Sequence, residues 1–314
     1  MDRRQFLSTG AAAAASVSVG KALADSDDTS NDKHFKLKYA PSPGQFKNHA
    51  GNNYIDQIKF AADQGFRAWE DNGMMNRSPE LQKKVGRTLN KLDMTMGVFV
   101  SFTGFGGFGD SDFMTKTTDA YQKKLKKTMK QAVEVAKRVN ATWTTVVPGA
   151  KSQALHPDYQ TANCVENLKV MAEVCEPHGL VMVLEPLNWF ANHPGLFLRS
   201  VPQAYQICKA VDSPSCKILD DLYHQQVDVG NLIPNMKQAW EEIPYLQMGD
   251  HPGRNEPLTG EINYRRIFKW LHDRDYKGVI GMEHGTSLSG KKGEKRLLKA
   301  YRWCDNFDEP LIEV

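Results

Sequence analysis

Short apolar segments alternate with longer amphipathic segments eight times between residues 35 and 307, and this repeat constrains the fold more than any other feature. Strands are expected at 35–39, 66–70, 96–101, 143–147, 180–184, 217–219, 245–248 and 278–282. Helices are expected at 54–64, from 78 onward, and at 118–139, 158–178, 201–211, 229–243, 263–273 and 292–307. Near-continuous apolar strands flanked by helices are typically parallel. Eight such units predict a closed (β/α)8 TIM barrel, whose active site lies at the carboxyl ends of the strands.

An open, doubly wound sheet is the main alternative for such a repeat. That fold usually carries a glycine-rich dinucleotide turn after a strand, and none of the predicted strands is followed by one. The composition does not shift in a way that would mark a second domain. We therefore expect residues 35–314 to form a single barrel domain, which is long enough to bury a substantial core.

The first 24 residues have the features of an export signal. Arg3 and Arg4 are followed by Phe6, a weakly apolar alanine-rich run and a small-x-small site before Asp25. The order resembles the twin-arginine signal, which carries proteins across a membrane already folded. We expect residues 1–24 to be removed, residues 25–34 to be a disordered lead-in, and the protein to be periplasmic or otherwise exported. The apolar run is too short and too mild to span a bilayer.

Charge and cysteine content exclude several classes of partner and scaffold. Residues 1–24 carry three basic residues and one acid, so their removal lowers the formal charge from +3 to +1. A nearly neutral chain gives no reason to expect nucleic acid or an anionic membrane as a partner. The five cysteines include no CxxC pair, which argues against a disulfide framework.

Polar residues follow four consecutive predicted strands. Glu185 comes after the fifth strand, Asp220 and Asp221 after the sixth, Gln247 lies in the seventh, and Glu283 comes after the eighth. Side chains alternate along a strand, so Glu185 shares a face with Val181 and Val183, and Glu283 with Val279 and Gly281. Asp220 and Asp221 must face opposite ways, and the strand phase leaves open which of them faces inward.

These side chains predict a site for one divalent cation. Two carboxylates that face each other repel unless a cation lies between them. Three carboxylates and one amide oxygen suit Mg²⁺ or Mn²⁺ better than zinc. An acid after one strand is often only a helix cap, but four consecutive strands with such residues favour a shared site. Export of a folded chain, with a cofactor loaded inside the cell, is consistent with a metal.

The segment 246–263, LQMGDHPGRNEPLTGEIN, places many polar side chains in a loop broken by glycine and proline. We interpret it as the mouth of the site, and the alternative is a solvated loop with a charged rim. Glu70, at the end of the second strand, could hydrogen-bond a substrate hydroxyl.

Several of these segments resemble the hydroxypyruvate isomerase family, one of the xylose-isomerase-like TIM-barrel sugar isomerases and epimerases. The resemblance lies in Glu185-Pro186-Leu187-Asn188, Asp221-Leu222-Tyr223-His224, the segment 252–264 and Glu283, and it follows strand order through the mature chain. It implies Glu185, Asp221, Gln247 and Glu283 as metal ligands, and so favours Asp221 over Asp220. It also implies Glu185 and Glu283 as the catalytic acid–base pair, with His224 and Arg254 binding the substrate.

The expected activity is metal-assisted aldose–ketose isomerisation of a small hydroxy-carbonyl compound, of the hydroxypyruvate to tartronate semialdehyde type, through an enediolate. A keto-sugar epimerase or lyase could use the same site. A metal-dependent endonuclease or phosphoesterase would need more histidines than the three near it. An exported sugar-binding protein without turnover is the alternative from another class. The sequence is compatible with a homo-oligomer as well as with a monomer.

Overall fold

The computed structural model describes residues 34–103 and 111–307. The described residues lie in one compact unit that begins at His34. The predicted signal, 1–24, and all but the last residue of the predicted lead-in lie outside the described residues. Within the described ranges, none of the helices combines the length and the apolar character needed to span a bilayer.

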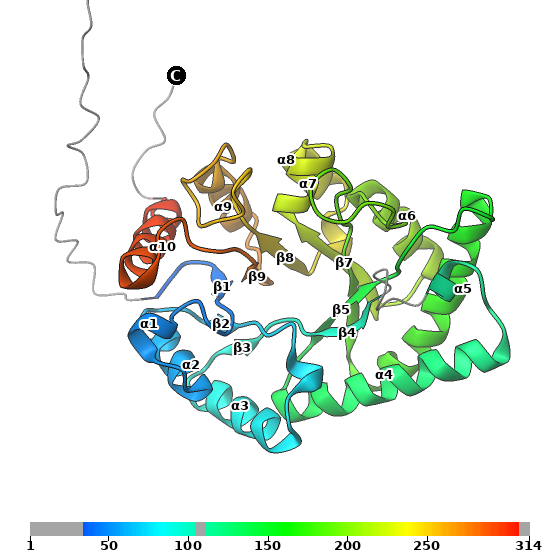
Figure 1. Cartoon of the computed structure of the whole chain (residues 1–314), viewed down its shortest axis with the longest axis horizontal. Helices are drawn as coiled ribbons and strands as arrows, with labels where there is room; N and C mark the ends of the chain where they lie inside the picture. Colours follow the sequence, from blue (N-terminus) through cyan, green and yellow to red (C-terminus); the bar gives the residue numbers. More distant parts are fainter. Residues whose placement is uncertain (1–33, 104–110, 308–314) are drawn as a thin grey trace, which may run out of the picture. The chain divides into compact units, whose positions relative to one another are not determined.

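The strands are all parallel and form a barrel, as predicted (Figure 1). Seven of them pair in the order β1-β9-β8-β7-β6-β5-β4, and β2 pairs with β3. The strands are β1 (Lys38–Ala40), β2 (Ala68–Trp69), β3 (Thr95–Met96), β4 (Val100–Thr103), β5 (Trp143–Val147), β6 (Val181–Leu184), β7 (Cys216–Asp221), β8 (Tyr245–Met248) and β9 (Val279–Met282).

The third predicted strand, 96–101, is divided into β3 and β4. Since β3 pairs with β2 and β4 with β5, the two occupy one strand position of the barrel. Between them, the Val98 backbone N–H donates to the Tyr245 hydroxyl at 3.2 Å instead of to a neighbouring strand. The gap between β1 and β2 is bridged by the Glu70 N–H, which donates to the Pro41 carbonyl at 2.9 Å. The barrel therefore has eight strand positions, and an interior side chain interrupts the third.

Helices pack around the strands, and local capping decides where several of them begin. The helices are α1 (Lys47–Ala50), α2 (Tyr54–Asp63), α3 (Pro79–Lys91), α4 (Asp119–Val139), α5 (Pro157–Cys175), α6 (Val201–Val211), α7 (Leu222–Asp228), α8 (Leu232–Gln238), α9 (Tyr264–His272) and α10 (Gly290–Asp305). Single 3₁₀ turns lie at Met74–Asn76, Ser111–Met114, Glu176–His178 and Trp240–Glu242. Asn53, Ser78 and Thr118 accept hydrogen bonds from first-turn N–H groups of α2, α3 and α4, the interaction that makes these residue types good N-caps.

The helix predicted at 229–243 is wrong in its position. The structure instead has α7, α8 and a 3₁₀ turn in this region. α7 begins directly after β7 because the Asp221 carboxylate caps it, accepting from the Tyr223 N–H at 2.8 Å. Gly230, with φ of 62°, then separates α7 from α8. This early start places His224 in the first turn of α7, beside the carboxyl end of β7.

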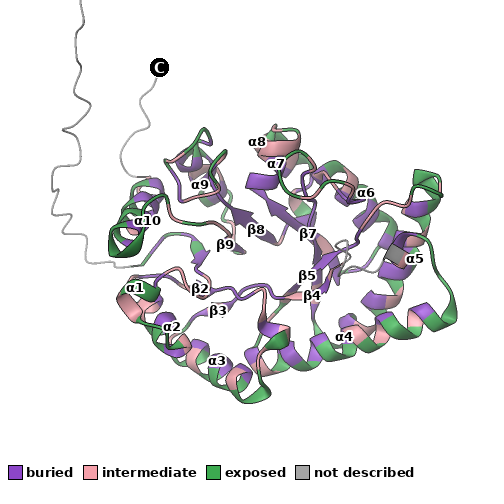
Figure 2. Cartoon of the chain, viewed as in Figure 1, coloured by how far each residue is buried: buried purple, intermediate pink, exposed green. Residues whose placement is uncertain are grey.

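The interior of the barrel is filled mainly with apolar side chains. In Figure 2 the strands are buried, and the helices present buried faces to them and exposed faces outward. The barrel interior is filled by Ala40, Ala68, Val98, Val183, Leu219, Tyr245 and Val279. A larger apolar cluster includes the buried faces of the helices. All five cysteines are buried and free, which agrees with the expected absence of a disulfide framework.

Gly97 is a position where the barrel interior leaves no room for a side chain. A Cβ atom there would overlap the Tyr245 hydroxyl and lie 3.2 Å from the Trp69 carbonyl oxygen. We expect Gly97→Ala to lower the free energy of unfolding by about 1–3 kcal/mol, the usual cost of overpacking, as measured by urea denaturation. Combining it with Tyr245→Phe should cost less than the sum of the two single changes, because the overlapping hydroxyl is gone. Strictly additive losses would contradict this contact.

Candidate functional site

Four predicted site residues lie at the carboxyl ends of four consecutive strands. Glu185 follows β6, Asp221 ends β7, Gln247 lies in β8 and Glu283 follows β9. Asp221 is in register with Gln247, and Gln247 with Gly281, two residues before Glu283. Glu185, Asp221 and Gln247 are buried, whereas 32% of the Glu283 side chain is exposed. The parallel register brings all four residues to the same end of the barrel.

Asp221, rather than Asp220, faces this site. Its Oδ2 atom lies 3.5 Å from His224 Nε2 and 3.0 Å from Arg254 Nη2. Asp220 is also buried, but neighbouring residues on a strand point to opposite faces, so it lies on the other side of β7. Burial, with a contribution from the Asp221 charge, raises the pKa of Asp220 to about 8. The structure thus resolves the alternative that the strand phase leaves open.

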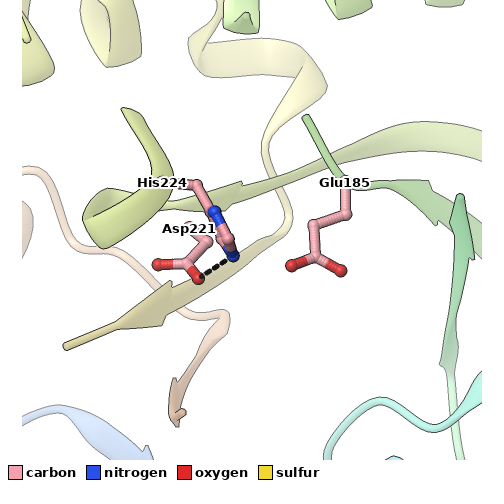
Figure 3. Close-up of side chains that lie close together, drawn as sticks. All are labelled: Glu185, Asp221 and His224. Atoms are coloured by element: carbon pink, nitrogen blue, oxygen red, sulfur yellow. Dashed lines mark ion pairs between the residues drawn. The ribbon is translucent and has the colours of Figure 1, made fainter. Parts of the chain in front are cut away.

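Glu185, Asp221 and His224 form a compact cluster (Figure 3). Each offers one oxygen or nitrogen atom, and these three atoms lie within 4.8 Å of one another. All three residues are buried. A group of this kind could hold a metal ion.

Asn188 fixes the orientation and the tautomer of His224. The Asn188 side-chain oxygen accepts from the backbone N–H groups of Ala191 (3.0 Å) and Asn192 (3.2 Å), so its amide nitrogen faces the histidine. That nitrogen lies 2.6 Å from His224 Nδ1, and the Asn188 backbone N–H also donates to Nδ1, at 3.4 Å. Nδ1 is therefore an acceptor. Because burial lowers the pKa of His224 to about 4, the neutral ring carries its proton on Nε2.

This tautomer makes His224 a hydrogen-bond donor at the site. The Nε2 atom that faces Asp221 bears the hydrogen, and a protonated ring nitrogen has no lone pair to give to a metal. In the cluster of Figure 3, Glu185 and Asp221 therefore offer carboxylate oxygens to an ion, whereas His224 offers an N–H donor. The predicted role of His224 in binding a substrate oxygen stays a prediction that needs such a donor.

Arg254 brings a positive charge between two of the carboxylates. Its Nη2 atom lies 3.0 Å from both Asp221 Oδ2 and Glu283 Oε2, and its Nε donates to the Glu283 carbonyl oxygen at 3.1 Å. The guanidinium carbon lies 4.7 Å from the centre of the Tyr223 ring, within the range of a cation–π interaction. The predicted substrate-binding arginine thus contacts two of the predicted metal ligands directly.

Two buried acids hold the loop that carries Arg254. Asp250 accepts hydrogen bonds from three backbone N–H groups at the far end of the loop, those of Thr259 (3.1 Å), Gly260 (2.9 Å) and Ile262 (3.1 Å). Glu256 accepts from the Ser287 N–H at 2.8 Å, which ties the loop to the segment after β9. Asp250 and Glu256 are fully buried, so these contacts are shielded from water. The loop that follows β8 is therefore anchored by two buried acids, although parts of it are exposed.

Like charges crowd this end of the barrel. Burial, together with the charges of Glu283 and Asp221, raises the pKa of Glu185 well above its ordinary value. Burial also raises the pKa of Glu283 to about 7, although Arg254 opposes the rise. Both shifts show that these carboxyl groups are poorly neutralised by the protein alone, and a divalent cation would relieve the repulsion.

Gln247 presents an amide oxygen that fits such an ion. Its Nε2 donates to Glu70 Oε1 at 2.8 Å, while its Oε1 is buried and has no hydrogen-bond partner among the described residues. An unpartnered amide oxygen is the kind of oxygen donor that Mg²⁺ and Mn²⁺ prefer. The donor types of the predicted ligands Glu185, Asp221, Gln247 and Glu283 therefore suit a divalent cation. Of the three carboxylates, Glu185 and Asp221 belong to the compact cluster with His224, and Glu283 does not.

Sequence reasoning missed three residues at the site or misjudged their contacts. Asn72 donates to Glu283 Oε1 at 3.4 Å, and its own side-chain oxygen is buried without a partner among the described residues. A single sequence does not distinguish it from an ordinary turn residue. Asn188 lies within the segment that carries the resemblance, which could have identified it. Glu70 is 1% exposed and its oxygens accept from Tyr245 and Gln247, so it is not placed to bind a substrate hydroxyl.

Sequence comparison relates the chain to named isomerases. The family described as "Xylose isomerase-like TIM barrel" matches residues 58–307. The hydroxypyruvate isomerase of Escherichia coli (strain K12) is 33% identical over 171 residues, which is 54% of this chain and 61% of that enzyme. A putative hydroxypyruvate isomerase of Danio rerio is 29% identical over 254 residues, covering 79% and 90% of the two chains. The 2-oxo-tetronate isomerase of Pectobacterium atrosepticum is 27% identical over 231 residues, covering 74% and 86%.

Structural comparison supports the fold. The AP endonuclease, family 2, of Brucella melitensis superimposes with a TM-score of 0.69 at 21% identity, covering 82% of this chain and 96% of that one. The 3-keto-D-glucoside 4-epimerase of E. coli gives a TM-score of 0.67 at 16% identity, covering 85% and 98%. At these identities the likeness extends to the architecture only.

The tautomer of His224 can be tested by NMR of protein labelled with ¹⁵N-histidine. We expect His224 to carry its proton on Nε2 and to stay neutral from about pH 8 to about pH 5.5, because its pKa is lowered to about 4. Asn188→Asp should move the proton to Nδ1, since a carboxylate can only accept there. His224→Gln assigns the signal. A proton on Nδ1 in the unmodified protein would contradict the assignment.

Proposed function

The chain belongs to the xylose isomerase-like TIM barrel family, and on this premise we propose that it is a metal-dependent isomerase. Its substrate would be a small hydroxy-carbonyl compound, converted in the manner of hydroxypyruvate to tartronate semialdehyde. The observation that carries the proposal is the convergence of Glu185, Asp221, Gln247 and Glu283 on one barrel mouth. The relatives named hydroxypyruvate isomerase and 2-oxo-tetronate isomerase support the class of substrate.

The four converging side chains would hold one Mg²⁺ or Mn²⁺ ion. Three carboxylates and one amide oxygen are hard donors, which favours these ions over zinc. When bound, the ion supplies positive charge that stabilises the negative charge developing on the carbonyl and neighbouring hydroxyl oxygens of the substrate.

Glu185 and Glu283 are the proposed acid–base pair. They come from different strands, so the substrate can lie between them. One carboxylate would remove the proton from the carbon that bears the hydroxyl, giving an enediolate. The other carboxyl group would return a proton to the former carbonyl carbon, while the hydroxyl proton passes to the former carbonyl oxygen, which completes the aldose–ketose exchange.

His224 and Arg254 would hold the substrate during this proton transfer. The Nε2–H of His224 points into the site and can donate to the oxygen on which charge develops. The Arg254 guanidinium has several N–H donors in one plane, which suits a carboxylate or a pair of hydroxyl oxygens. A substrate with a carboxylate next to its keto group, as in a small keto acid, would use both residues.

The proposal predicts deuterium uptake by the substrate. Metal-loaded enzyme in D₂O should introduce deuterium next to the carbonyl of hydroxypyruvate or a related small keto sugar, as detected by mass spectrometry. Glu185→Gln and Glu283→Gln should each lower turnover by roughly 10²–10⁴-fold, the usual contribution of a general acid or base. Glu261→Gln is the control, because this exposed glutamate has its side-chain hydrogen bonds, among the described residues, with His251 and Gln226.

Other outcomes would identify the alternatives. A product with inverted configuration would indicate an epimerase, and carbon–carbon cleavage a lyase, with the same residues at work. Binding of a sugar without any deuterium uptake across a panel of substrates would contradict an isomerase and support a binding protein.

We also propose that the protein acts after export, on the evidence of the twin-arginine pattern in residues 1–24. In cell fractionation, the unmodified chain should be found outside the cytoplasm and shortened by about the length of a signal peptide. Replacing Arg3 and Arg4 together with lysine should leave the full-length precursor inside the cell. Lys21→Gln, which removes a charge but keeps the arginine pair, should be exported normally. Export of the double-lysine variant would count against the proposal.

A further inference from the structure

Glu70 is a buried acid that the proposed reaction does not use. It directly follows β2, is 1% exposed, and its side chain reaches across the barrel interior to β8. Its Oε2 atom accepts from the Tyr245 hydroxyl at 2.7 Å, and its Oε1 atom accepts from Gln247 Nε2 at 2.8 Å. The Tyr245 hydroxyl in turn accepts from the Val98 backbone N–H at 3.2 Å. A continuous chain of hydrogen bonds therefore runs from the barrel wall to Gln247.

The strand next to Gln247, β9, leaves room for these hydrogen-bonded side chains. A Cβ atom on Gly281 would overlap Glu70 Oε2 and lie 2.9 Å from Gln247 Cγ. Gly97 in the same way leaves space for the Tyr245 hydroxyl. Gly281 in β9 and Gly97 between β3 and β4 thus leave space for the Tyr245–Glu70–Gln247 contacts. A side chain at either position would fill that space.

The hydrogen bond from Gln247 to Glu70 decides which end of the amide faces the cation site. A carboxyl oxygen without a proton can only accept, so it selects the NH₂ group of the amide. This holds whether or not the other Glu70 oxygen carries a proton. The amide oxygen must then point the opposite way, where it is buried and lacks a partner among the described residues. With the amide reversed, an NH₂ group would face the cation, which it cannot bind.

We infer that Glu70 is the positioning residue of the metal site: it holds the Gln247 amide with its oxygen toward the ion. This inference rests on the proposed function, because it assigns a second layer to the same cation site. Partners of this kind typically change metal affinity by about 10–100-fold when they are replaced. The Tyr245 hydroxyl in turn holds Glu70 by a hydrogen bond, and Gly281 and Gly97 leave space for the two side chains.

The test is a double-mutant cycle in metal affinity. Titration calorimetry with Mn²⁺ and Mg²⁺ is carried out on the unmodified protein, Glu70→Gln, Gln247→Glu and the combined variant. Glu70→Gln replaces one of the two acceptor oxygens with an NH₂ group, so residue 70 no longer excludes the reversed Gln247 amide, and we expect the change to weaken binding by about 10–100-fold. Gln247→Glu alone sets two carboxyl groups against each other. In the combined variant the amide and the carboxylate exchange places, so the hydrogen bond is restored and Mn²⁺ affinity should recover relative to Glu70→Gln.

Two further measurements separate positioning from a merely structural role. Thermal unfolding without metal shows whether Glu70→Gln is folded, and the rise in midpoint on adding Mn²⁺ should be smaller than in the unmodified protein. Tyr245→Phe is the matched control, since it removes the other hydrogen bond of Glu70 but leaves the contact with Gln247. Its Mn²⁺ affinity should fall less than that of Glu70→Gln.

The outcomes distinguish the two levels of the argument. Unmodified protein that binds neither Mn²⁺ nor Mg²⁺ overturns the metal site of the proposed function, and this inference with it. The unmodified protein can instead bind the ion while Glu70→Gln binds it with equal affinity, or while the two changes show no coupling in the cycle. Either result overturns the role of Glu70 alone.

Discussion

Repulsion among buried carboxyl groups at the ends of β6, β7 and β9 is the constraint on which the rest of the site depends. Burial and the charges of Glu283 and Asp221 raise the pKa of Glu185, and burial and the charge of Asp221 raise that of Glu283, while Arg254 offsets only part of each rise. Such a cluster is costly unless positive charge is supplied at the same place. The anchored loop after β8 supplies one charge by fixing Arg254, and a divalent cation would supply the rest.

The barrel beneath the site makes this crowding possible. Its interior is filled by small and branched apolar side chains, so the strand ends are held rigidly and the carboxyl groups cannot move far apart. Parallel register then places Asp221, Gln247 and Gly281 at one level, two residues before Glu283. The polar side chains that enter the interior pass through space left by glycines. The apolar packing and the polar site are therefore two parts of one arrangement.

Sequence reasoning predicts what depends on local pattern and misses what depends on distant contacts. The alternation of apolar strands and amphipathic helices is sufficient to predict the parallel barrel and the residues at its mouth. The break in the third strand follows from Tyr245, which is 147 residues from Val98 in the chain. The early start of α7 had a local signal in Asp221, but a strand-end acid can be a helix cap and a site residue at once, and here it is both. The contact between Glu70 and Gln247 joins residues 177 positions apart, and no short-range pattern indicates it.

A count of charge connects the separate features of the site. The charges of three carboxylates, the Arg254 guanidinium and the proposed divalent cation would sum to zero, so any further polar group at the site would have to be neutral to keep that balance. His224 is neutral because burial lowers its pKa to about 4. Gln247 is an amide and carries no charge. Burial raises the pKa of Glu70, whose carboxyl group accepts from that amide, to about 8. The protein thus places neutral side chains, those of His224 and Gln247, beside its charged carboxylates. These groups can orient an ion and a substrate without competing with the carboxylates for positive charge.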